Sequence, residues 1–380
     1  MAKQKLNSPK KPPKRTKLDP GDAKNKLNKL REAISTNLHK YAEIALRLGK
    51  EDPKTLARIL ATLATLPTRS KRKTSTDAKT VEATLSAETE QTIFRKLAVS
   101  IENLVMRAET KVAFLGPLHS YSHLATLEGF GSDIQPVPVR TIAAVFEEVS
   151  SGQVHAGVVP IENSTDGRIV DTLERLTQAS VKICGEIPLP IHHNLLGIGK
   201  RSDVTEVCSK PQAISQCRDW LSEHLPGAKI TSMSSTTAAA ERASKDKTVA
   251  AIASRQAGVE YGLKVLAKNI EDNKNNVTRF AVIGLEVAKR SGNDKTSMMF
   301  ELAHESGALA DAMMIFKRKS LNLTWIESFP KPGSTNEYLF FVELLGHQSD
   351  LKVRKAVASL EKKTVRLELL GSYPQRTFEI

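Results

Sequence analysis

From Lys111 onward, short apolar runs alternate with longer amphipathic segments, and no other feature restricts the fold of this 380-residue chain more. Short apolar runs are typical of buried strands, and apolar positions three or four residues apart are typical of helices. A chain that alternates the two builds βαβ units and an α/β sheet. Residues 111–288 therefore predict an α/β domain with two lobes and a cleft between them. The expected elements include 112–115, 141–150, 156–159, 169–177, 181–187, 195–198, 205–208, 212–225, 237–244, 248–252 and 280–283.

The last segment, 294–380, has a different order of expected elements: strand, helix, strand, strand, helix, strand. This is the ferredoxin-like βαββαβ arrangement. Because such small sheets often pair side by side, we expect a C-terminal domain that helps the chain to form a homodimer or homotetramer.

The segment before the α/β part, 27–110, has apolar positions at helical spacing and no strand pattern. We expect three helices, with an exposed loop at 67–80, and hence a small all-α domain. Residues 1–26 contain nine basic and two acidic residues and almost nothing apolar, so they cannot bury a core. We interpret them as a disordered, solvated tail. A nucleic-acid-binding arm is the less favoured alternative, because no aromatic residues are interleaved with the basic ones.

The composition narrows the class of protein. A hydrophobic fraction of 40% and a charged fraction of 26% are ordinary for a soluble globular protein, although the net charge is +14. No apolar run reaches about 18 residues, and the first residues lack the apolar core of a secretory signal. Three cysteines without a Cys-x-x-Cys motif do not make a disulfide framework. We therefore expect a cytoplasmic protein without a membrane partner.

Patterns for metal or nucleotide binding are incomplete. His119 and His123 have the spacing of a zinc pair on an expected helix, but no third ligand lies near them. His192 and His193 precede an expected strand, where adjacent residues face opposite sides. P-loop, dinucleotide-binding and nucleophile-elbow motifs are absent from the sequence. We expect neither a metal ion nor a cofactor.

Polar side chains instead gather where expected strands end and helices begin. Ser120 and Ser122 follow the strand 112–115, Asn163 follows the strand 156–159, and Ser235 opens a helix. Helix N-termini favour anions, and α/β folds bind ligands at the carboxyl ends of their strands. These positions predict a pocket for a carboxylate or a phosphate, although each residue alone is more typical of a plain helix cap.

Four motifs, taken in order, resemble the prephenate dehydratase family. They are Gly116-Pro117 with Ser120-Tyr121-Ser122, Val159-Pro160-Ile161-Glu162-Asn163-Ser164, Pro211-Gln212 with Gln216-Cys217, and Asn276-Val277-Thr278-Arg279-Phe280. The resemblance covers 111–288, and 294–380 resembles the ACT regulatory domain that commonly follows. It implies a two-lobed, periplasmic-binding-protein-like dehydratase domain. It also implies conversion of prephenate to phenylpyruvate, water and carbon dioxide in phenylalanine biosynthesis, with no metal or redox cofactor.

The resemblance also assigns roles to individual residues. Thr278 is implied to hydrogen-bond or protonate the departing hydroxyl. Arg279 is the second implied catalytic residue, which either holds a carboxylate or forms a buried ion pair behind the site. His119 stands where the family often has a small residue, and we expect a tolerated packing change there. The implied substrate-binding residues are Ser120, Ser122, Asn163, Ser164, Gln216, Ser235, Thr236 and Phe280.

In the ACT segment the implied effector is L-phenylalanine, bound between paired domains. The family's second effector motif usually reads Glu-Ser-Arg-Pro, and Phe329 replaces its arginine here. We therefore expect feedback by phenylalanine to persist but to be weaker. The implied effector-binding residues are Gly307, Ala308, Leu309, Asn322, Glu327 and Ser328.

Residues 27–110 are similar to the chorismate mutase domain that precedes the dehydratase in bifunctional relatives. Arg31 matches one of its cations, and Leu104 stands where the family has a glutamine. Further cations, Arg47, Lys50 and Arg58, are out of the usual register. We favour a degenerate dimerisation domain. An active bifunctional enzyme, an arogenate dehydratase and a non-enzymatic amino-acid sensor are the alternatives, and Thr278 favours an enzyme over a sensor.

Overall fold

The computed structural model describes residues 110–331 and 337–376. Contacts divide the chain into two units, Met1–Ala108 and Glu109–Ile380, and every described residue belongs to the second. The predicted basic tail and the predicted helical domain, up to residue 109, lie outside the described residues.

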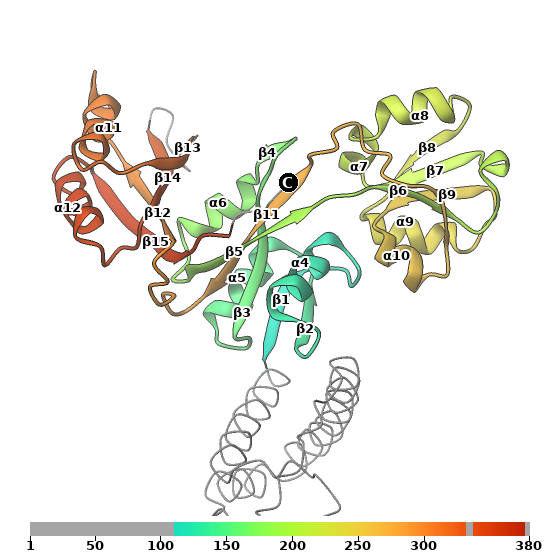
Figure 1. Ribbon diagram of the computed structural model, residues 1–380, viewed down its shortest axis with the longest axis horizontal. Helices are drawn as coiled ribbons and strands as arrows, with labels where there is room; N and C mark the ends of the chain where they lie inside the picture. The colour runs from blue at the N-terminus through green and yellow to red at the C-terminus, as the bar shows by residue number, and fades with distance from the viewer. Residues whose placement is uncertain (1–109, 332–336, 377–380) are drawn as a thin grey trace, which may run out of the picture. The chain divides into compact units, whose positions relative to one another are not determined.

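The first lobe is a mixed α/β layer structure. Its elements are β1 (Lys111–Leu115), α4 (Tyr121–Phe130), β2 (Gln135–Val139), α5 (Ile142–Ser150), β3 (Ala156–Asn163), β4 (Gly167–Arg168), α6 (Val170–Leu176), β5 (Lys182–Pro190) and β11 (Val277–Gly284). The sheet order is β2-β1-β3-β11-β5, with β1 parallel to β2 and β3, and β11 antiparallel to both of its neighbours. Ala113 of β1 packs in the core that contains Val145 of α5, whereas Phe114 packs with Ala125 of α4. Helices therefore cover both faces of the sheet, which explains why β1 is apolar throughout (Figure 1).

The second lobe has its own five-stranded sheet. Its elements are β6 (Asn194–Gly197), the 3₁₀ turn Arg201–Asp203, β7 (Glu206–Ser209), α7 (Pro211–Ser215), α8 (Arg218–His224), β8 (Lys229–Ser232), α9 (Thr236–Ala243), β9 (Val249–Ala253), α10 (Arg255–Glu260) and β10 (Lys264–Ala267). The strand order is β10-β6-β9-β7-β8. Small residues of α9 and β9, among them Ala239, Ala240 and Ala251, are fully buried against each other, so the helix lies close to the sheet.

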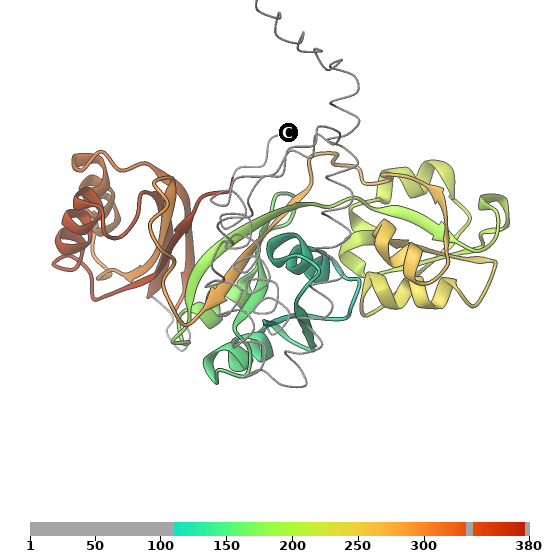
Figure 2. The ribbon, with the colours of Figure 1, turned by 60° about the horizontal axis from the view of Figure 1, so that its bottom comes forward.

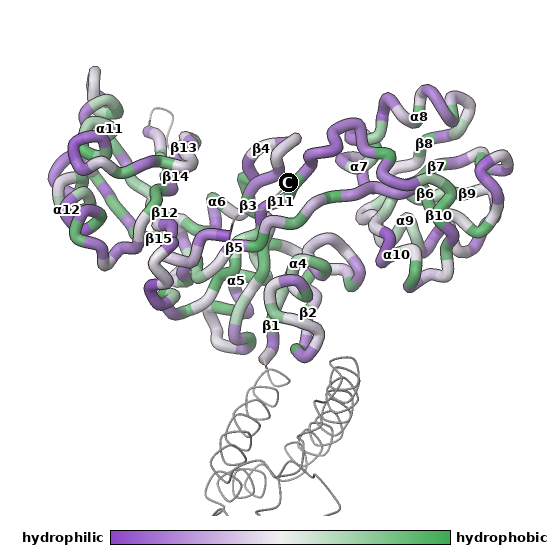
Figure 3. The backbone as a smooth tube through the Cα atoms, viewed as in Figure 1, coloured by the Kyte–Doolittle hydropathy of each residue, from purple (hydrophilic) through white to green (hydrophobic). Residues whose placement is uncertain are grey.

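Two linkers, 191–193 and 268–276, connect the lobes, and they are hydrogen-bonded to each other. The amide of Ile191 donates to the carbonyl oxygen of Asn276, and the amide of Ile270 donates to the carbonyl oxygen of His193, both at 2.8 Å. The longer linker is strongly hydrophilic (Figure 3), and the strands β5 and β11 that lead into the linkers lie side by side (Figures 1 and 2). The linkers therefore bring polar groups to the boundary between the lobes.

The C-terminal segment has the predicted order of elements, namely β12 (Asp294–Glu301), α11 (Ala308–Arg318), β13 (Leu323–Pro330), β14 (Tyr338–Leu345), α12 (Leu351–Leu360) and β15 (Arg366–Pro374). Its antiparallel sheet has the order β13-β14-β12-β15, the ferredoxin-like topology. One face of the sheet packs on the two helices, through residues such as Phe300, Phe316 and Leu360.

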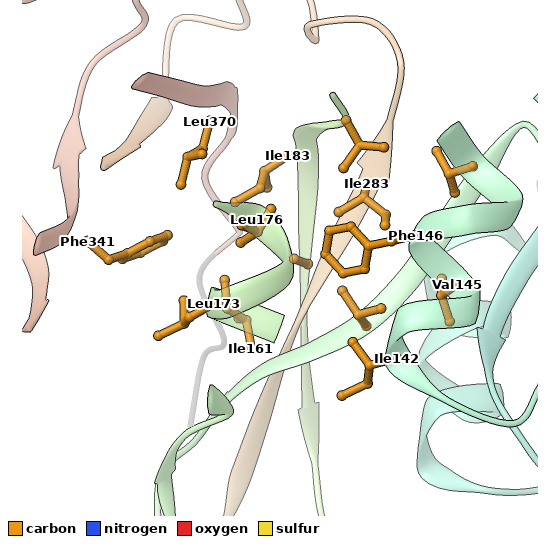
Figure 4. Close-up of a cluster of buried hydrophobic side chains, with 14 of the residues drawn as sticks. Ile142, Val145, Phe146, Ile161, Leu173, Leu176, Ile183, Ile283, Phe341 and Leu370 are labelled. Atoms are coloured by element: carbon orange, nitrogen blue, oxygen red, sulfur yellow. The ribbon is translucent and has the colours of Figure 1, made fainter. Parts of the chain in front are cut away.

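The other face of this sheet is continuous with the core of the first lobe. Phe341 and Leu370 lie in one buried cluster with Leu173 and Leu176 of α6 and Ile183 of β5 (Figure 4). Since this cluster excludes water from the C-terminal sheet and from the first lobe alike, the two share one hydrophobic core.

Two local predictions were wrong. The helix expected over 212–225 is broken into α7 and α8, because the chain turns at Gln216 and Cys217, where the Cys217 side chain is fully buried. His119 and His123 do not share a helix, since α4 begins after the N-cap Ser120 and His119 has a positive φ of 64°. That backbone conformation suits a glycine better than any side chain.

Candidate active site

A cavity of about 420 Å³ lies between the two lobes and is lined by residues of both. The structure brings eight of the predicted site residues together there: Ser120, Ser122, Asn163, Gln216, Ser235, Thr236, Thr278 and Phe280. Ser164 and Arg279 are not among the lining residues. The Ser164 hydroxyl instead accepts a hydrogen bond from the amide of Val277 at 2.9 Å and donates one to the carbonyl oxygen of Asn275, at the end of the longer linker.

Thr278 reaches the cavity because it lies on β11 directly opposite Asn163 of β3. Asn163 Nδ2 donates to Thr278 Oγ1 at 2.8 Å. The carbonyl Oδ1 of Asn163 is held by the backbone amides of Thr165 and Asp166, at 2.9 and 3.0 Å. The orientation of the Asn163 amide is therefore set by the backbone, and its N–H group points at the threonine hydroxyl.

A line of buried amides continues from Asn163 across the site. Asn163 Nδ2 also donates to Asn276 Oδ1 at 2.9 Å, and Asn276 Nδ2 donates to Gln216 Oε1 at 3.1 Å. Gln216 Oε1 lies 2.8 Å from His193 Nε2, and Gln216 Nε2 donates to a carboxylate oxygen of Asp166 at 2.7 Å. The line thus joins the first lobe, both linkers and the second lobe.

Arg279 lies on the opposite face of β11 from Thr278 and Phe280, as the two-residue period of a strand requires. Its guanidinium is ion-paired with Glu162 at 2.9 Å, with Glu186 at 3.2 Å and with Glu343 of the C-terminal sheet at 2.6 Å. Burial opposes its charge, but Glu343, Tyr373 and Glu162 together outweigh burial and raise the pKa of Arg279. The interpretation as a substrate-carboxylate ligand is thereby corrected, and the ion-pair alternative describes the geometry.

Two helix N-termini border the cavity, one from each lobe. Ser120 caps α4 by accepting from the amide of His123 at 3.3 Å, and Ser235 caps α9 by accepting from the amide of Ala238 at 2.9 Å. The first residues of both helices line the cavity, so the positive ends of their dipoles lie beside it, where an anion is stabilised.

Several lining residues were not predicted from the sequence. Arg140 follows β2 in the first lobe, and Lys210 follows β7 in the second. Neither has an ion-pair partner among the described residues, so both are available to an anion. Their positions at the carboxyl ends of strands were the available signal. His193 and Tyr121 also line the cavity, and their hydroxyl-to-Nδ1 distance is 3.1 Å.

His119 lies outside the set of cavity-lining residues. Its ring packs edge-on against His123, with ring centroids 5.4 Å apart, and its Nε2 lies 3.6 Å from a carboxylate oxygen of Glu260. The residue therefore contributes packing next to the cavity rather than a group inside it.

A second, smaller hollow of about 140 Å³ lies in the C-terminal domain. It is lined by Ala308 and Leu309 at the start of α11, next to Gly307, whose φ of 86° is left-handed. The other implied effector residues, Asn322, Glu327 and Ser328, do not line it.

The strand β13 carries two of these remaining positions, Glu327 and Ser328. Glu327 is ion-paired with Arg168 of the first lobe. Phe329, only 4% exposed, packs in the core shared with that lobe, so the residue that replaces the usual arginine serves the domain junction.

Within the described ranges, no group of three or more histidine, cysteine, aspartate or glutamate side chains could hold a metal ion. Among the same residues, no helix is both long enough and apolar enough to span a membrane.

Fold and cavity together define a class of protein: an α/β enzyme that holds a small anionic substrate between two lobes. The family model described as prephenate dehydratase matches residues 112–288. The chain belongs to the prephenate dehydratase family, and it is a lyase that converts prephenate to phenylpyruvate, water and carbon dioxide.

Three relatives illustrate the match. The bifunctional chorismate mutase/prephenate dehydratase of Aquifex aeolicus is 41% identical over 273 residues, which is 72% of this chain and 75% of that protein. The prephenate dehydratase of Methanocaldococcus jannaschii is 38% identical over 272 residues, 69% of this chain and 97% of that protein. The crystal structure of prephenate dehydratase from Arthrobacter aurescens in complex with L-Phe covers 70% of this chain and 90% of its own, with 32% identity and a TM-score of 0.66. The arogenate dehydratase and sensor alternatives are not favoured by these relatives.

Proposed function

We propose that Thr278 is the group that assists the departing hydroxyl of prephenate. Asn163 already donates a hydrogen bond to Thr278 Oγ1, so the hydroxyl proton of Thr278 is free to be donated into the cavity. As the ring carboxylate leaves as carbon dioxide, the electrons of the broken C–C bond enter the ring and the C–O bond breaks. The departing hydroxide accepts the hydrogen bond of Thr278 and takes up one proton from solvent to leave as water. Aromatisation drives the step, so positioning and one donor suffice.

Two substitutions test this role. Thr278→Ala removes the donor, whereas Thr278→Ser keeps a hydroxyl at the same place. We expect kcat to fall at least about tenfold for the alanine variant with KM nearly unchanged, because the interaction is made mainly in the transition state. The serine variant should keep most of the activity. Phenylpyruvate formation, followed by its absorbance in alkali, measures both, and a smaller loss in Thr278→Ala would show that another group assists the hydroxyl.

We propose that the two carboxylates of prephenate are held by Arg140 and Lys210 together with the helix N-termini at Ser120 and Ser235. The support is that each lobe contributes to the same cavity one helix N-terminus and one cation that has no ion-pair partner in the part of the chain that the structure describes. Arg140→Gln and Lys210→Gln should raise KM more than they lower kcat. Unchanged KM in both variants would contradict this assignment.

We propose that 294–380 is an ACT domain through which phenylalanine inhibits the enzyme, with the effector bound next to Gly307 and Leu309 between two paired copies. The hollow beside these residues and the exposed side chain of Ile326 on the edge strand β13 support the proposal. Because Phe329 is committed to the domain junction, the effector lacks an arginine there, and binding should be weak. Calorimetry with millimolar phenylalanine should give heat and lower activity, and no heat together with unchanged activity would refute it.

We propose that 27–110 is a degenerate mutase-like domain that supports oligomerisation in a cytoplasmic homodimer or homotetramer. Purified protein should consume little chorismate, and removal of 27–110 should reduce its mass in sedimentation. Chorismate consumption at a rate comparable with prephenate turnover would instead make the chain a bifunctional enzyme. The cations to substitute first would then be Arg31, Arg47, Lys50 and Arg58.

A further inference from the structure

We propose that His193 is a positioning residue for the dehydration. Its Nε2–H group anchors the Gln216 amide, whose direction Asp166 sets, and the line of amides that starts there holds the nitrogen side of the Asn163 amide in place against Thr278. The proposal rests on the role proposed for Thr278. His193 is only 2% exposed and lies on the shorter linker between the lobes.

The direction of the Gln216 amide follows from Asp166. A carboxylate oxygen of Asp166 accepts from the Gln216 side chain at 2.7 Å, and a carboxylate only accepts hydrogen bonds. The atom that faces Asp166 is therefore the nitrogen of Gln216, and its oxygen faces His193 Nε2 at 2.8 Å. Since an amide oxygen only accepts, His193 Nε2 must carry a proton.

The same oxygen accepts from Asn276 Nδ2, so Asn276 is oriented as well. Its Oδ1 then accepts from Asn163 Nδ2, whose second N–H bond goes to Thr278 Oγ1. Asn163, Asn276 and Gln216 are buried, so water cannot easily replace any of these partners. Loss of the His193 donor leaves Gln216 Oε1 with a single donor and allows the middle of the line to relax.

His193 itself is held from several sides. Its backbone amide donates to Glu271 at 2.9 Å, and its Nδ1 faces the hydroxyl of Tyr121 at 3.1 Å. That hydroxyl also lies 2.7 Å from the carbonyl oxygen of His192. Tyr121 has one hydroxyl proton, which goes either to the carbonyl oxygen of His192 or to Nδ1 of a neutral His193. When it goes to His192, Nδ1 must carry a proton and donate to Tyr121. In both cases Gln216 Oε1 requires the proton on Nε2.

The charged or titratable groups around the ring are Tyr121, Asp166, His192 and Glu271. Burial lowers the pKa of His193, so its neutral form with the proton on Nε2 predominates at neutral pH.

Two amide substitutions separate positioning from acid catalysis. His193→Gln places an N–H group near the position of Nε2 and can still donate to Gln216. His193→Asn places its amide near the position of Nδ1 and cannot reach Gln216. We expect kcat for prephenate to fall at least about fivefold in His193→Asn, which corresponds to about 1 kcal/mol, with KM nearly unchanged. The kcat of His193→Gln should stay within about threefold of the wild-type value, because this variant keeps the hydrogen bond to Gln216.

The outcomes are distinct. Equal loss in both variants, with unchanged thermal midpoints, would mean that the imidazole acts as an acid and would overturn the proposal. Activity near that of the wild type in both would overturn it too. Absence of any turnover by the wild type would refute the proposed function and not the hydrogen-bond direction.

A second measurement does not depend on activity. In ¹⁵N-histidine-labelled wild type, nitrogen chemical shifts report which ring nitrogen carries the proton, and the signal missing from His193→Gln identifies His193. We expect the Nε2–H tautomer, and the Nδ1–H tautomer would overturn the proposal.

Discussion

The junction around Arg279 predicts an unequal response to removing its cation and removing one of its anions. Two cations, Arg279 and Lys295, face three carboxylates, those of Glu162, Glu186 and Glu343. The side chains of Glu186 and Glu343 are only 3% and 1% exposed. The cluster therefore has one negative charge in excess, and water reaches only the carboxylate of Glu162 among the three.

The charge count sets the magnitudes. Arg279→Met leaves Lys295 alone with three carboxylates, and breaking a buried ion pair from one side costs about 3–5 kcal/mol of unfolding free energy. Glu343→Gln leaves two cations with two carboxylates, and its amide can still accept from the hydroxyl of Tyr373. The loss should then be about 1–2 kcal/mol, the scale of a weakened hydrogen-bond set. The cluster of the double variant has half the excess negative charge of the cluster in Arg279→Met. The double variant should therefore be no less stable than Arg279→Met alone.

Trp325 provides the assay, because its ring centroid lies 4.8 Å from the guanidinium carbon of Arg279. The chain has two tryptophans, so a Trp220→Phe background leaves Trp325 as the only indole reporter. Urea unfolding of the four proteins in this background, followed by fluorescence, gives the transition of the junction. If Glu343→Gln were as destabilising as Arg279→Met, or if the two losses simply added, the charge-balance reasoning would be refuted.

Two further predictions concern the same domain junction and the thiols. Gly371→Ala should destabilise the contact of β15 with β5 and lower the thermal midpoint of unfolding. The reason is that φ at Gly371 is 153° and an added Cβ would overlap the carbonyl oxygen of Ile183. A midpoint equal to that of the wild type would contradict this. Burial raises the pKa of Cys184 and Cys208 to about 11 and that of Cys217 further. At pH 8 about one in 1,000 of the native Cys184 and Cys208 thiols is therefore ionised, against about one in four in the unfolded chain. Mass spectrometry should therefore find iodoacetamide labelling far slower in native protein than in urea, and rapid native labelling of any of the three would show that its burial is wrong.

The order of elements could be predicted from the sequence because it depends on local periodicity. Alternating apolar runs and amphipathic segments define the lobes, and the βαββαβ order of 294–376 is recoverable from the spacing of apolar residues alone. Polar residues that follow strands also point to the cavity, since the carboxyl ends of strands meet at one edge of a sheet. Ser120, Asn163 and Ser235 were found in this way, and the same rule would have found Arg140 and Lys210.

Contacts between distant residues were decided only by the tertiary structure. The two-residue period of a strand predicts that Thr278 and Phe280 share one face of β11 and that Arg279 lies on the other. It does not predict which of the two faces lines the cavity. That choice depends on Glu343, which lies 64 residues further along the chain and enters only when the C-terminal sheet docks on the first lobe. His193 and Gln216 meet for a similar reason, because the helix expected over 212–225 breaks at Gln216 and the linker carries His193 beneath it. Local patterns carry no information on such pairings, since the free energy that selects them is gained only when separate elements are buried together.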